Sequence, residues 1–202
     1  KRHGLTLRVS GGWVRDKVLG KESHDIDIAV DGKIDGKPVT GAMFAGLMAQ
    51  ASGKSFAVIA ANPDQSKHLE TATMDVHGVS VDFVHLRSET YGDSRIPEVS
   101  IGTPEVDAHR RDLTINSLFF NINENRVEDL TGKGIADLKA GVIRTPLDSA
   151  KTLKDDPLRA LRAIRFAAKF GFKVDDSLME AMQADHIKET LANKVAVERM
   201  IP

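Results

Sequence analysis

Two carboxylates, Asp25 and Asp27, stand two residues apart in a short apolar segment that favours a β-strand. Successive side chains of a strand point to opposite faces, so these two carboxylates share one face. Neighbouring carboxylates repel each other unless a cation lies between them, and a ligand set made only of oxygen suits Mg²⁺. A solvent-facing edge strand would explain the same pair, because charged residues are ordinarily exposed. The pair is therefore a candidate metal site, and the neighbouring sequence must decide between this interpretation and an exposed strand.

A third carboxylate, Asp82, lies in the segment Val79–Val84, which alternates apolar and polar residues as a half-buried strand does. Val81 and Phe83 are expected to face the core, which places Asp82 on the opposite face. Carboxylates that converge on metal ions would suit phosphoryl transfer, because the ions lower the pKa of an attacking hydroxyl and hold a phosphate chain. Catalysis of that kind rests on positioning and charge neutralisation. The alternative is a polar residue on the outer face of a hairpin.

A pair of glycines, Gly11 and Gly12, lies between a predicted strand at Leu5–Ser10 and a predicted helix at Trp13–Leu19. Glycines at such a turn allow backbone N–H groups to approach a phosphate closely. Plain turns also contain glycine pairs, so this signal gains weight only from the carboxylates that follow it.

A polar stripe with a period of three residues occurs late in the chain. It consists of Asp156, Arg159, Arg162 and Arg165, and the apolar residues Leu158, Leu161 and Ile164 form a neighbouring stripe that could dock a helix. Residues three apart on an α-helix drift by only about 60° per step, so the polar side chains stay on one slowly turning face. Residues 151–173 contain seven basic and two acidic side chains. A solvated helix face is the simple explanation, but an arginine donor fork beside an aspartate acceptor pair can also match the edge of a nucleobase.

The chain of 202 residues carries 28 basic and 29 acidic side chains and no Cys. This balance argues against a generally basic nucleic-acid coat but not against a local basic groove. The absence of Cys excludes thiolate zinc sites, cysteine nucleophiles and a disulfide scaffold. No apolar run reaches the roughly 18 residues of a membrane span, so we expect a soluble protein with no membrane partner. The chain begins at Lys1 rather than Met and stops at Pro202 within a new apolar pattern, so we expect both ends to be cuts in a longer protein.

Up to about residue 145 the chain alternates short apolar runs with turn signals, which predicts a mixed α/β arrangement. Further predicted elements are a strand at Asp25–Val30, a helix at Val39–Ala51, a strand at Phe56–Ala60, and a hairpin of Thr71–His77 and Val79–Leu86 that turns near Gly78. Ser88–Asp107 has little periodicity and is predicted to be a long loop, either functional or mobile.

From about Ser149 the pattern becomes helical. Helices are predicted over residues 154–170, 175–185 and 194 onward, with breaks at Gly171 and near His186. We therefore predict a mixed domain over residues 1–148 and a truncated helical domain over residues 149–202.

Four motifs, in order along residues 9–200, resemble those of one protein family. The run from Gly11 to Asp16, followed by Asp25-Ile26-Asp27-Ile28, resembles the signature of the DNA polymerase β-like nucleotidyltransferase superfamily, in its tRNA nucleotidyltransferase and bacterial-type poly(A) polymerase branch. Residues 110–118 resemble the R-R-D-x-T-I-N-A-L motif of this branch. Residues 155–166 resemble its E-D-x-x-R segment, with Asp155 where Glu is usual, and residues 193–200 are similar to its V-S-x-E-R-I stretch. The stretches at residues 129–132 and 145–147 are most similar to eukaryotic-type class II CCA-adding enzymes.

The resemblance implies an α+β fold, in which a polymerase β-like nucleotidyltransferase head with a mixed β-sheet and flanking helices precedes a truncated helical neck. It implies template-independent addition of CCA to tRNA 3′ ends from CTP and ATP, with two Mg²⁺ ions. A poly(A) or A-adding polymerase shares these motifs, and a nucleotide-binding or RNA-binding module that has lost catalysis is a third possibility. The expected location is intracellular, in the cytoplasm, mitochondrion or nucleus if the source is eukaryotic. The oligomeric state stays open.

By the same resemblance, the catalytic residues are Asp25, Asp27 and Asp82, of which Asp25 and Asp27 hold the metal. The nucleotide-binding residues are Gly11, Gly12, Arg15, Arg111, Asp112, Asp156, Arg159, Arg162 and Arg165. Among these, Asp156 and Arg159 recognise the base, Arg162 and Arg165 contact the phosphates, Arg15 contacts the triphosphate, and Asp112 lies near the ribose. We expect Asp16 and Asn116 to be structural hydrogen-bonding partners, Trp13 to be a packing residue and His24 to lie at the surface. A local ion pair is the structural alternative for Arg110, Arg111 and Asp112.

Overall fold

A mixed seven-stranded sheet forms the centre of residues 4–60, 70–92 and 97–194, the parts of the chain that the computed structural model describes. In spatial order its strands are β11 (Arg126–Glu128), β10 (Phe119–Asn121), β1 (Thr6–Ser10), β2 (Ile26–Asp31), β7 (Val79–His85), β6 (Thr71–Val76) and β5 (Phe56–Ile59). β2 and β7 run parallel, and the other neighbouring pairs are antiparallel. The parallel pair lies at the middle of the sheet, where two segments far apart in sequence meet.

Helix α1 (Gly12–Val18) follows β1 through a tight turn at Gly11, whose φ of 69° is unfavourable for other residue types. The chain then returns as β2, antiparallel to β1. The strand–glycine–helix–strand unit predicted from the sequence is therefore confirmed. The strand predicted at Phe56–Ala60 and the hairpin predicted around Gly78 are confirmed as β5 and as β6 with β7.

Helix α2 (Gly41–Ser52) covers one face of β6 and β7. It begins after Thr40, whose Oγ1 accepts a hydrogen bond from the backbone N–H of Met43 at 3.1 Å. On its buried face, Ala45 packs in a core that includes Met74, Val81 and Phe83. The short hairpin of β3 (Lys33–Ile34) and β4 (Lys37–Pro38) joins β2 to this helix.

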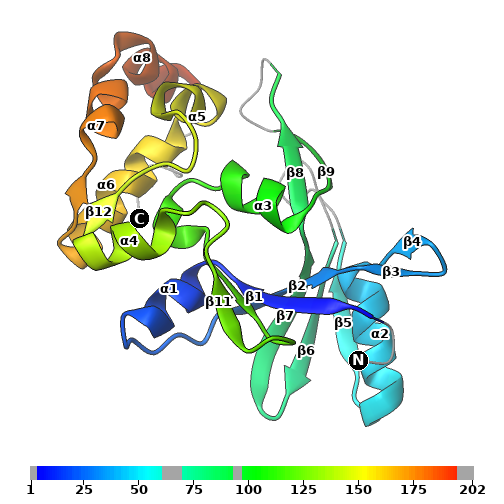
Figure 1. The fold of residues 1–202 in the computed structure, drawn as a ribbon. Helices are drawn as coiled ribbons and strands as arrows, with labels where there is room; N and C mark the ends of the chain where they lie inside the picture. The colour runs from blue at the N-terminus through cyan, green and yellow to red at the C-terminus, as the bar shows by residue number, and fades with distance from the viewer. Residues whose placement is uncertain (1–3, 61–69, 93–96, 195–202) are drawn as a thin grey trace.

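The prediction of a long loop over Ser88–Asp107 is wrong. A further hairpin, β8 (Arg87–Thr90) with β9 (Glu98–Ile101), and helix α3 (Pro104–Arg110) occupy this stretch and stand above the sheet in Figure 1. Thr103 caps α3, since its Oγ1 accepts a hydrogen bond from the backbone N–H of Val106 at 3.3 Å. The strands are short and mostly polar, so they lack the alternation by which strands are recognised. Residues 93–96 lie outside the described part of the chain.

Four helices gather at the end of the molecule remote from α2 (Figure 1). They are α5 (Ser149–Asp155), α6 (Leu158–Phe170), α7 (Asp176–Gln183) and α8 (Asp185–Lys194). Helix α4 (Gly134–Ala140) and a parallel pair of short strands, β12 (Val142–Ile143) and β13 (Lys173–Val174), join them to the sheet region. We call the part that contains α5 to α8 the neck, and the part before Ser149, which contains the seven-stranded sheet, the head.

Two details of the predicted neck are wrong. The single helix expected over residues 154–170 is two helices, because Pro157 lacks the N–H that would continue α5. The break expected near His186 lies instead at Ala184, and α8 runs through His186. The helix expected from residue 194 onward falls outside the described residues beyond Lys194. Among the helices described, none combines the length and apolarity that a membrane crossing needs.

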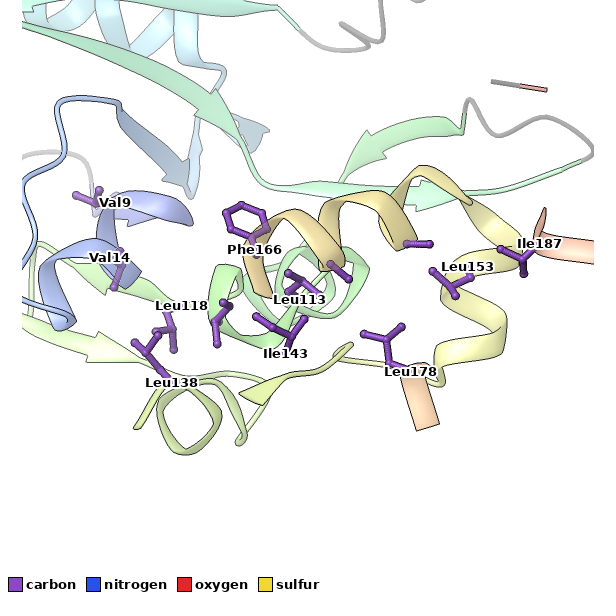
Figure 2. Packing of buried hydrophobic residues seen from close by; sticks show 13 residues of the cluster. Val9, Val14, Leu113, Leu118, Leu138, Ile143, Leu153, Phe166, Leu178 and Ile187 are labelled. Atoms are coloured by element: carbon purple, nitrogen blue, oxygen red, sulfur yellow. The ribbon is translucent and has the colours of Figure 1, made fainter. Parts of the chain in front are cut away.

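The largest hydrophobic core crosses from the head to the neck. Figure 2 shows it running from Val9 and Val14 through Leu113 and Ile143 to Leu153, Leu178 and Ile187. Helix α6 enters this core through Ala160, Ala163 and Phe166. The prediction that Leu158, Leu161 and Ile164 dock this helix on the rest of the domain is therefore wrong. Ile164, for example, is 54% exposed. Helix α6 packs against α5, β12 and β13, and its arginines line the cleft at the boundary of the two parts.

The contact of α2 with β7 leads to a test of the fold. A methyl group on Gly41 would lie 2.1 Å from the carbonyl oxygen of Phe83, so we expect Gly41→Ala to lower the free energy of unfolding by about 3 kcal/mol. Gly46→Ala, in the same helix, is the matched control. Its new methyl group would meet only Phe56, at 3.9 Å, and alanine favours the helix by about 1 kcal/mol. Urea unfolding of both variants should give changes of opposite sign, and a harmless Gly41→Ala would contradict the packing.

Candidate active site

A cleft of about 730 Å³ lies between the head and the neck. Ten of the twelve residues expected to form the site line it: Gly11, Gly12, Arg15, Asp25, Arg111, Asp112, Asp156, Arg159, Arg162 and Arg165. The other two, Asp27 and Asp82, line a smaller hollow of about 260 Å³. Arg87, Arg110 and Arg111 line both spaces, so the two hollows share a wall. The structure thus gathers the predicted residues from five separate segments into one region.

The cleft is strongly basic although the whole chain has a formal net charge of -1. Its lining contains eight cationic side chains, namely Arg15, Arg87, Arg110, Arg111, Arg159, Arg162, Arg165 and Lys169. The acidic lining residues are four, namely Asp25, Glu89, Asp112 and Asp156. A concave surface with such an excess of positive charge attracts and concentrates anions.

The parallel pairing of β2 and β7 places Asp27 directly beside Asp82. Their side chains share one face of the sheet, and Thr73 Oγ1 orients Asp82 by donating a hydrogen bond of 2.6 Å to its Oδ1. Asp25 is exposed and lies just before β2. Burial raises the pKa of Asp27, and the charges of Asp25 and Asp82 raise it further against the opposing effect of Arg111. The carboxylates therefore crowd one another, as the alternation in the sequence predicts.

The number of carboxylates at this place limits the kind of metal site that they could form. Within residues 4–60, 70–92 and 97–194, no three acidic or histidine side chains form a group that could hold an ion by themselves. Mg²⁺ commonly keeps several waters and is bound through one or two carboxylates together with substrate phosphates. The carboxylates fit that kind of site, because a cation would relieve the repulsion that raises the pKa of Asp27. His24 is exposed, as expected.

Two arginines lie close to the glycine turn. A methyl group on Gly11 would lie 2.8 Å from Arg111 Nη1, and one on Gly12 would lie 3.4 Å from Arg15 Nη2. The backbone N–H of Gly11 donates to the carbonyl oxygen of Leu118 at 3.0 Å. The positive φ of Gly11 and the close approach of Arg111 therefore account for a glycine at position 11, whereas the distance at Gly12 is an ordinary van der Waals contact.

Arg15 is 5% exposed and links the head to the neck. Its guanidinium carbon lies 5.0 Å from the ring centre of Phe166 and 4.9 Å from that of Phe170, both on α6. Arg15 Nε and Nη2 donate to the two carboxylate oxygens of Asp16, and Nη1 donates to Asn116 Oδ1. Asp16 and Asn116 are thus hydrogen-bonding partners, as expected. Trp13 packs against Phe120 and the main core.

An ion pair between Asp112 and Arg162 also joins the head to the neck, with Arg162 Nε 2.7 Å from Asp112 Oδ2. Asp112 Oδ1 accepts hydrogen bonds from the backbone N–H of Leu113 and from Asn116 Nδ2. Burial raises the pKa of Asp112, but Arg162 and the hydrogen bond from Asn116 outweigh it and hold the pKa below its usual value. The ionised form is therefore stabilised inside the cleft wall.

Asp107, which the sequence analysis missed, holds two arginines in place. It is 1% exposed, and its carboxylate accepts hydrogen bonds from Arg110 at 2.6 and 2.9 Å and from Arg111 at 2.7 and 3.0 Å. The backbone N–H of Arg87 donates to it as well. Burial raises the pKa of Asp107, but Arg111 and Arg110 outweigh it and lower the pKa overall. Arg110 and Arg111 thus form local ion pairs, but with Asp107 of α3 and not with Asp112, which pairs with Arg162 of the neck, so the alternative expected for residues 110–112 is only partly right.

Glu89 and Tyr91 of the unpredicted hairpin hold Arg159. Arg159 Nη2 donates to the Tyr91 hydroxyl at 2.9 Å and lies 3.6 Å from Glu89 Oε2. The Tyr91 hydroxyl donates to Glu89, which also pairs with Arg110. Asp156 faces the same cleft, and its Oδ1 accepts from the backbone N–H of Leu158. The only sequence signal for this arrangement was the clustering of Arg87, Glu89 and Tyr91 in a segment without periodicity.

A family model described as the poly(A) polymerase head domain matches residues 7–144. The chain belongs to this family. Its α+β fold, with a central mixed sheet and flanking helices, matches the polymerase β-like head of CCA-adding enzymes, which confirms the expected fold class. The family consists of metal-dependent nucleotidyltransferases.

Known relatives agree with this assignment to the poly(A) polymerase head family. The chain is 48% identical over 211 residues to a mitochondrial CCA tRNA nucleotidyltransferase of Saccharomyces cerevisiae, a match that covers 99% of this chain and 38% of the yeast protein. Among solved structures, a tRNA nucleotidyltransferase complexed with a primer tRNA and an incoming ATP analog is 29% identical, with a TM-score of 0.75, over 98% of this chain and 51% of that one. The CCA-adding enzyme of Bacillus stearothermophilus in complex with CTP is 25% identical, with a TM-score of 0.74, over 99% of this chain and 43% of that one. The chain therefore spans well under two thirds of the length of each.

The buried charges around Asp107 lead to a prediction about acid stability. Asp107→Asn should lower the free energy of unfolding at pH 7 by about 3 kcal/mol, because Arg110 and Arg111 lose a buried countercharge. Since folding lowers the pKa of Asp107, its contribution is complete above the unfolded pKa of about 3.9 and is lost as the pH falls through the lower folded pKa. Urea unfolding from about pH 5 down to about pH 2 should therefore show a weaker acid dependence in the variant.

Asp75→Asn is the control for that measurement. The pKa of Asp75 is also lowered, by the backbone N–H of Gly78 and by Lys54, but Asp75 is exposed and should contribute little to stability. Equal losses in the two variants would contradict the importance of the buried network.

Proposed function

We propose that this chain is the catalytic head and the beginning of the neck of a template-independent tRNA nucleotidyltransferase, which adds CCA to tRNA 3′ ends from CTP and ATP. The arrangement of the site carries the proposal: a pair of carboxylates on neighbouring parallel strands adjoins a basic cleft lined by the family motifs. The names of the relatives support it, because they specify CCA addition and complexes with a primer tRNA, an ATP analog and CTP. The name of the yeast relative also supports the mitochondrion as the compartment.

In the proposed reaction, the terminal 3′-hydroxyl of tRNA attacks the α-phosphorus of the bound nucleotide. A new O–P bond forms and pyrophosphate leaves with the electron pair of the bond that breaks. The arginines of the cleft wall would bind the triphosphate and stabilise the negative charge of the transition state, in positions that Asp107 and Glu89 fix in advance. Mg²⁺ held by Asp25 and Asp27, with Asp82 beside Asp27, would neutralise further charge and favour deprotonation of the hydroxyl.

The neck supplies the proposed base and phosphate contacts. Asp156 and Arg159 line the cleft at the N-terminal end of α6, where an acceptor pair and a donor fork can match the edge of cytosine or adenine. Arg159 is only 11% exposed and is oriented by Tyr91 and Glu89. Arg162 and Arg165 follow along the same face toward the glycine turn, where they would contact the phosphates.

Nucleotide incorporation tests the proposal directly. The full-length protein, incubated with tRNA lacking its 3′ end and with CTP or ATP separately, should use both, whereas exclusive use of ATP would indicate a poly(A) or A-adding polymerase. Asp27→Asn should abolish incorporation without loss of stability, because the substitution removes a carboxylate that Asp25 and Asp82 repel. Asp31→Asn, on the same strand but paired with Arg8, is the control that should stay active. An active, well-folded Asp27→Asn variant would refute the metal assignment.

The base-reading role has its own test. Arg159→Ala should reduce the discrimination of CTP and ATP from GTP and UTP by about tenfold or more, because a hydrogen bond to a charged group contributes roughly 1.5–3 kcal/mol. Competition between nucleotides in the incorporation assay measures this ratio. Arg126→Ala is the control. Arg126 lies on β11, away from the cleft, and pairs with Glu124 and Glu128. An unchanged nucleotide preference in Arg159→Ala would count against the assignment.

A further inference from the structure

Only some of the positive charges in the cleft are neutralised by the protein. The pairs between arginines and carboxylates are Arg15 with Asp16, Arg110 and Arg111 with Asp107, Arg159 with Glu89, and Arg162 with Asp112. Arg165 and Lys169 line the cleft at the C-terminal end of α6, and neither forms an ion pair within the described part of the chain. Positive charge without a countercharge therefore gathers at this end of the cleft.

Two stacked rings position these cations. The rings of Phe166 and Phe170 are nearly parallel, with an angle of 7° and a distance of 5.9 Å between their centres. The guanidinium carbon of Arg165 lies 5.3 Å from the centre of the Phe166 ring. From the centre of the Phe170 ring, Lys169 Nζ lies at 5.5 Å and Lys21 Nζ at 4.8 Å. The π-electrons of a ring attract a cation, but the ring carries no net charge. The rings therefore hold these cations in place and leave their charge available to an anion.

Lys21 and Lys169, which we call the cleft-end lysines, approach Phe170 from two parts of the chain. Lys169 lies in the last turn of α6, Lys21 lies in the loop that joins α1 to β2, and both are exposed. The negative end of the helix dipole favours a cation in the last turn of α6, but it corresponds to only about half an elementary charge. Together with Arg165, the lysines supply three full positive charges, so this end of the cleft still attracts anions.

The distance along α6 indicates which anion fits here. Arg159, in the proposed base site, precedes Lys169 by ten residues, which span about 15 Å of helix. Arg162 and Arg165 lie between them on the same face, at steps of three or four residues. A nucleotide with its base at Arg159 and its phosphates along Arg162 and Arg165 would bring its terminal phosphate to Lys169. The β- and γ-phosphates, which leave together as pyrophosphate, carry most of the negative charge of the nucleotide.

We propose that the cleft-end lysines bind the γ-phosphate of the incoming nucleotide and keep contact with pyrophosphate as it leaves, so that the C-terminal end of α6 is the exit of the leaving group. This inference rests on the proposed function, since it takes a nucleoside triphosphate as the substrate. A lysine suits the role because its ammonium is a compact charge with three donors on a flexible stem, which can follow a phosphate that moves. The phosphate groups of RNA offer the same chemistry, so the test separates the two sources.

The experiment measures the binding of inorganic pyrophosphate, CTP and CMP to the full-length protein by calorimetry, and the KM for tRNA in the incorporation assay. Lys21→Gln, Lys169→Gln and the double variant remove the charges but keep much of the length of the side chains. Lys139→Gln is the matched control, because Lys139 is an exposed lysine of α4 that does not line the cleft. CMP lacks the β- and γ-phosphates and reports on the rest of the nucleotide site.

We expect each single variant to weaken the binding of pyrophosphate and of CTP by about threefold, and the double variant by about tenfold, because each exposed ion pair contributes only modestly. The binding of CMP and the KM for tRNA should stay at their wild-type values. Inhibition of the reaction by added pyrophosphate should weaken by the same factors. Lys139→Gln should match the wild-type protein in every measurement, and Lys169→Arg, which keeps the charge, should retain the binding of pyrophosphate.

Unchanged binding of pyrophosphate in the double variant would overturn the inference, as would an equal loss for CMP or an equal loss in Lys139→Gln. A higher KM for tRNA together with unchanged binding of pyrophosphate would assign the lysines to RNA instead. If the wild-type protein binds CTP and pyrophosphate but adds no nucleotide to tRNA, the proposed function fails, and the binding measurements still decide the role of the lysines.

Discussion

The site depends on the docking of α6 against the head. Arg15 is buried against Phe166 and Phe170, and Asp112 pairs with Arg162, so two charged groups of the head lose water at the boundary. Buried charges of this kind are tolerated only with good geometry and full hydrogen bonding. The core shared by head and neck supplies the packing that holds this geometry. Without α6 in this position, the cleft would lack one wall and Arg15 would lack its aromatic cover.

A second constraint is the crowding of arginines. Arg87, Arg110, Arg111 and Arg159 line one cleft, and like charges at close range destabilise a folded protein. Asp107 and Glu89 offset this repulsion from buried positions, because each accepts charge-assisted hydrogen bonds from guanidinium groups. The repulsion between these arginines is therefore compensated within the folded protein, before a ligand binds. An anion that enters finds donors already oriented, which is the condition under which electrostatic stabilisation is most effective.

The sequence predicted the parts of the site that local periodicity controls. Asp27 and Asp82 follow from alternation on strands, and the glycine turn follows from its place between a strand and a helix. Glu89 and Tyr91 were missed because β8 is short and polar and Tyr91 lies just after it, where no period distinguishes a strand from a loop. Asp107 was missed because α3 has only seven residues, about two turns, which is too short for a clear helical period. The buried face of α6 was predicted wrongly because Ala160 and Ala163, which lie in the shared core, carry little hydrophobic signal in the sequence. Contacts between distant segments, such as Asn116 with Arg15, have no local signature at all.

The buried carboxylates divide into two kinds by the direction of their pKa shifts. Asp107 and Asp112 are more deeply buried than Asp27, yet their pKa values are lowered, since arginines satisfy the charge, together with the backbone N–H of Arg87 at Asp107 and the side chain of Asn116 at Asp112. Asp27 has its pKa raised, because the acidic neighbours Asp25 and Asp82 add to the effect of burial. Desolvation acts in the same direction on all three, so the neighbours decide the sign. Asp107 and Asp112 are thus satisfied by the protein itself, whereas the repulsion around Asp27 is of the kind that a bound cation relieves.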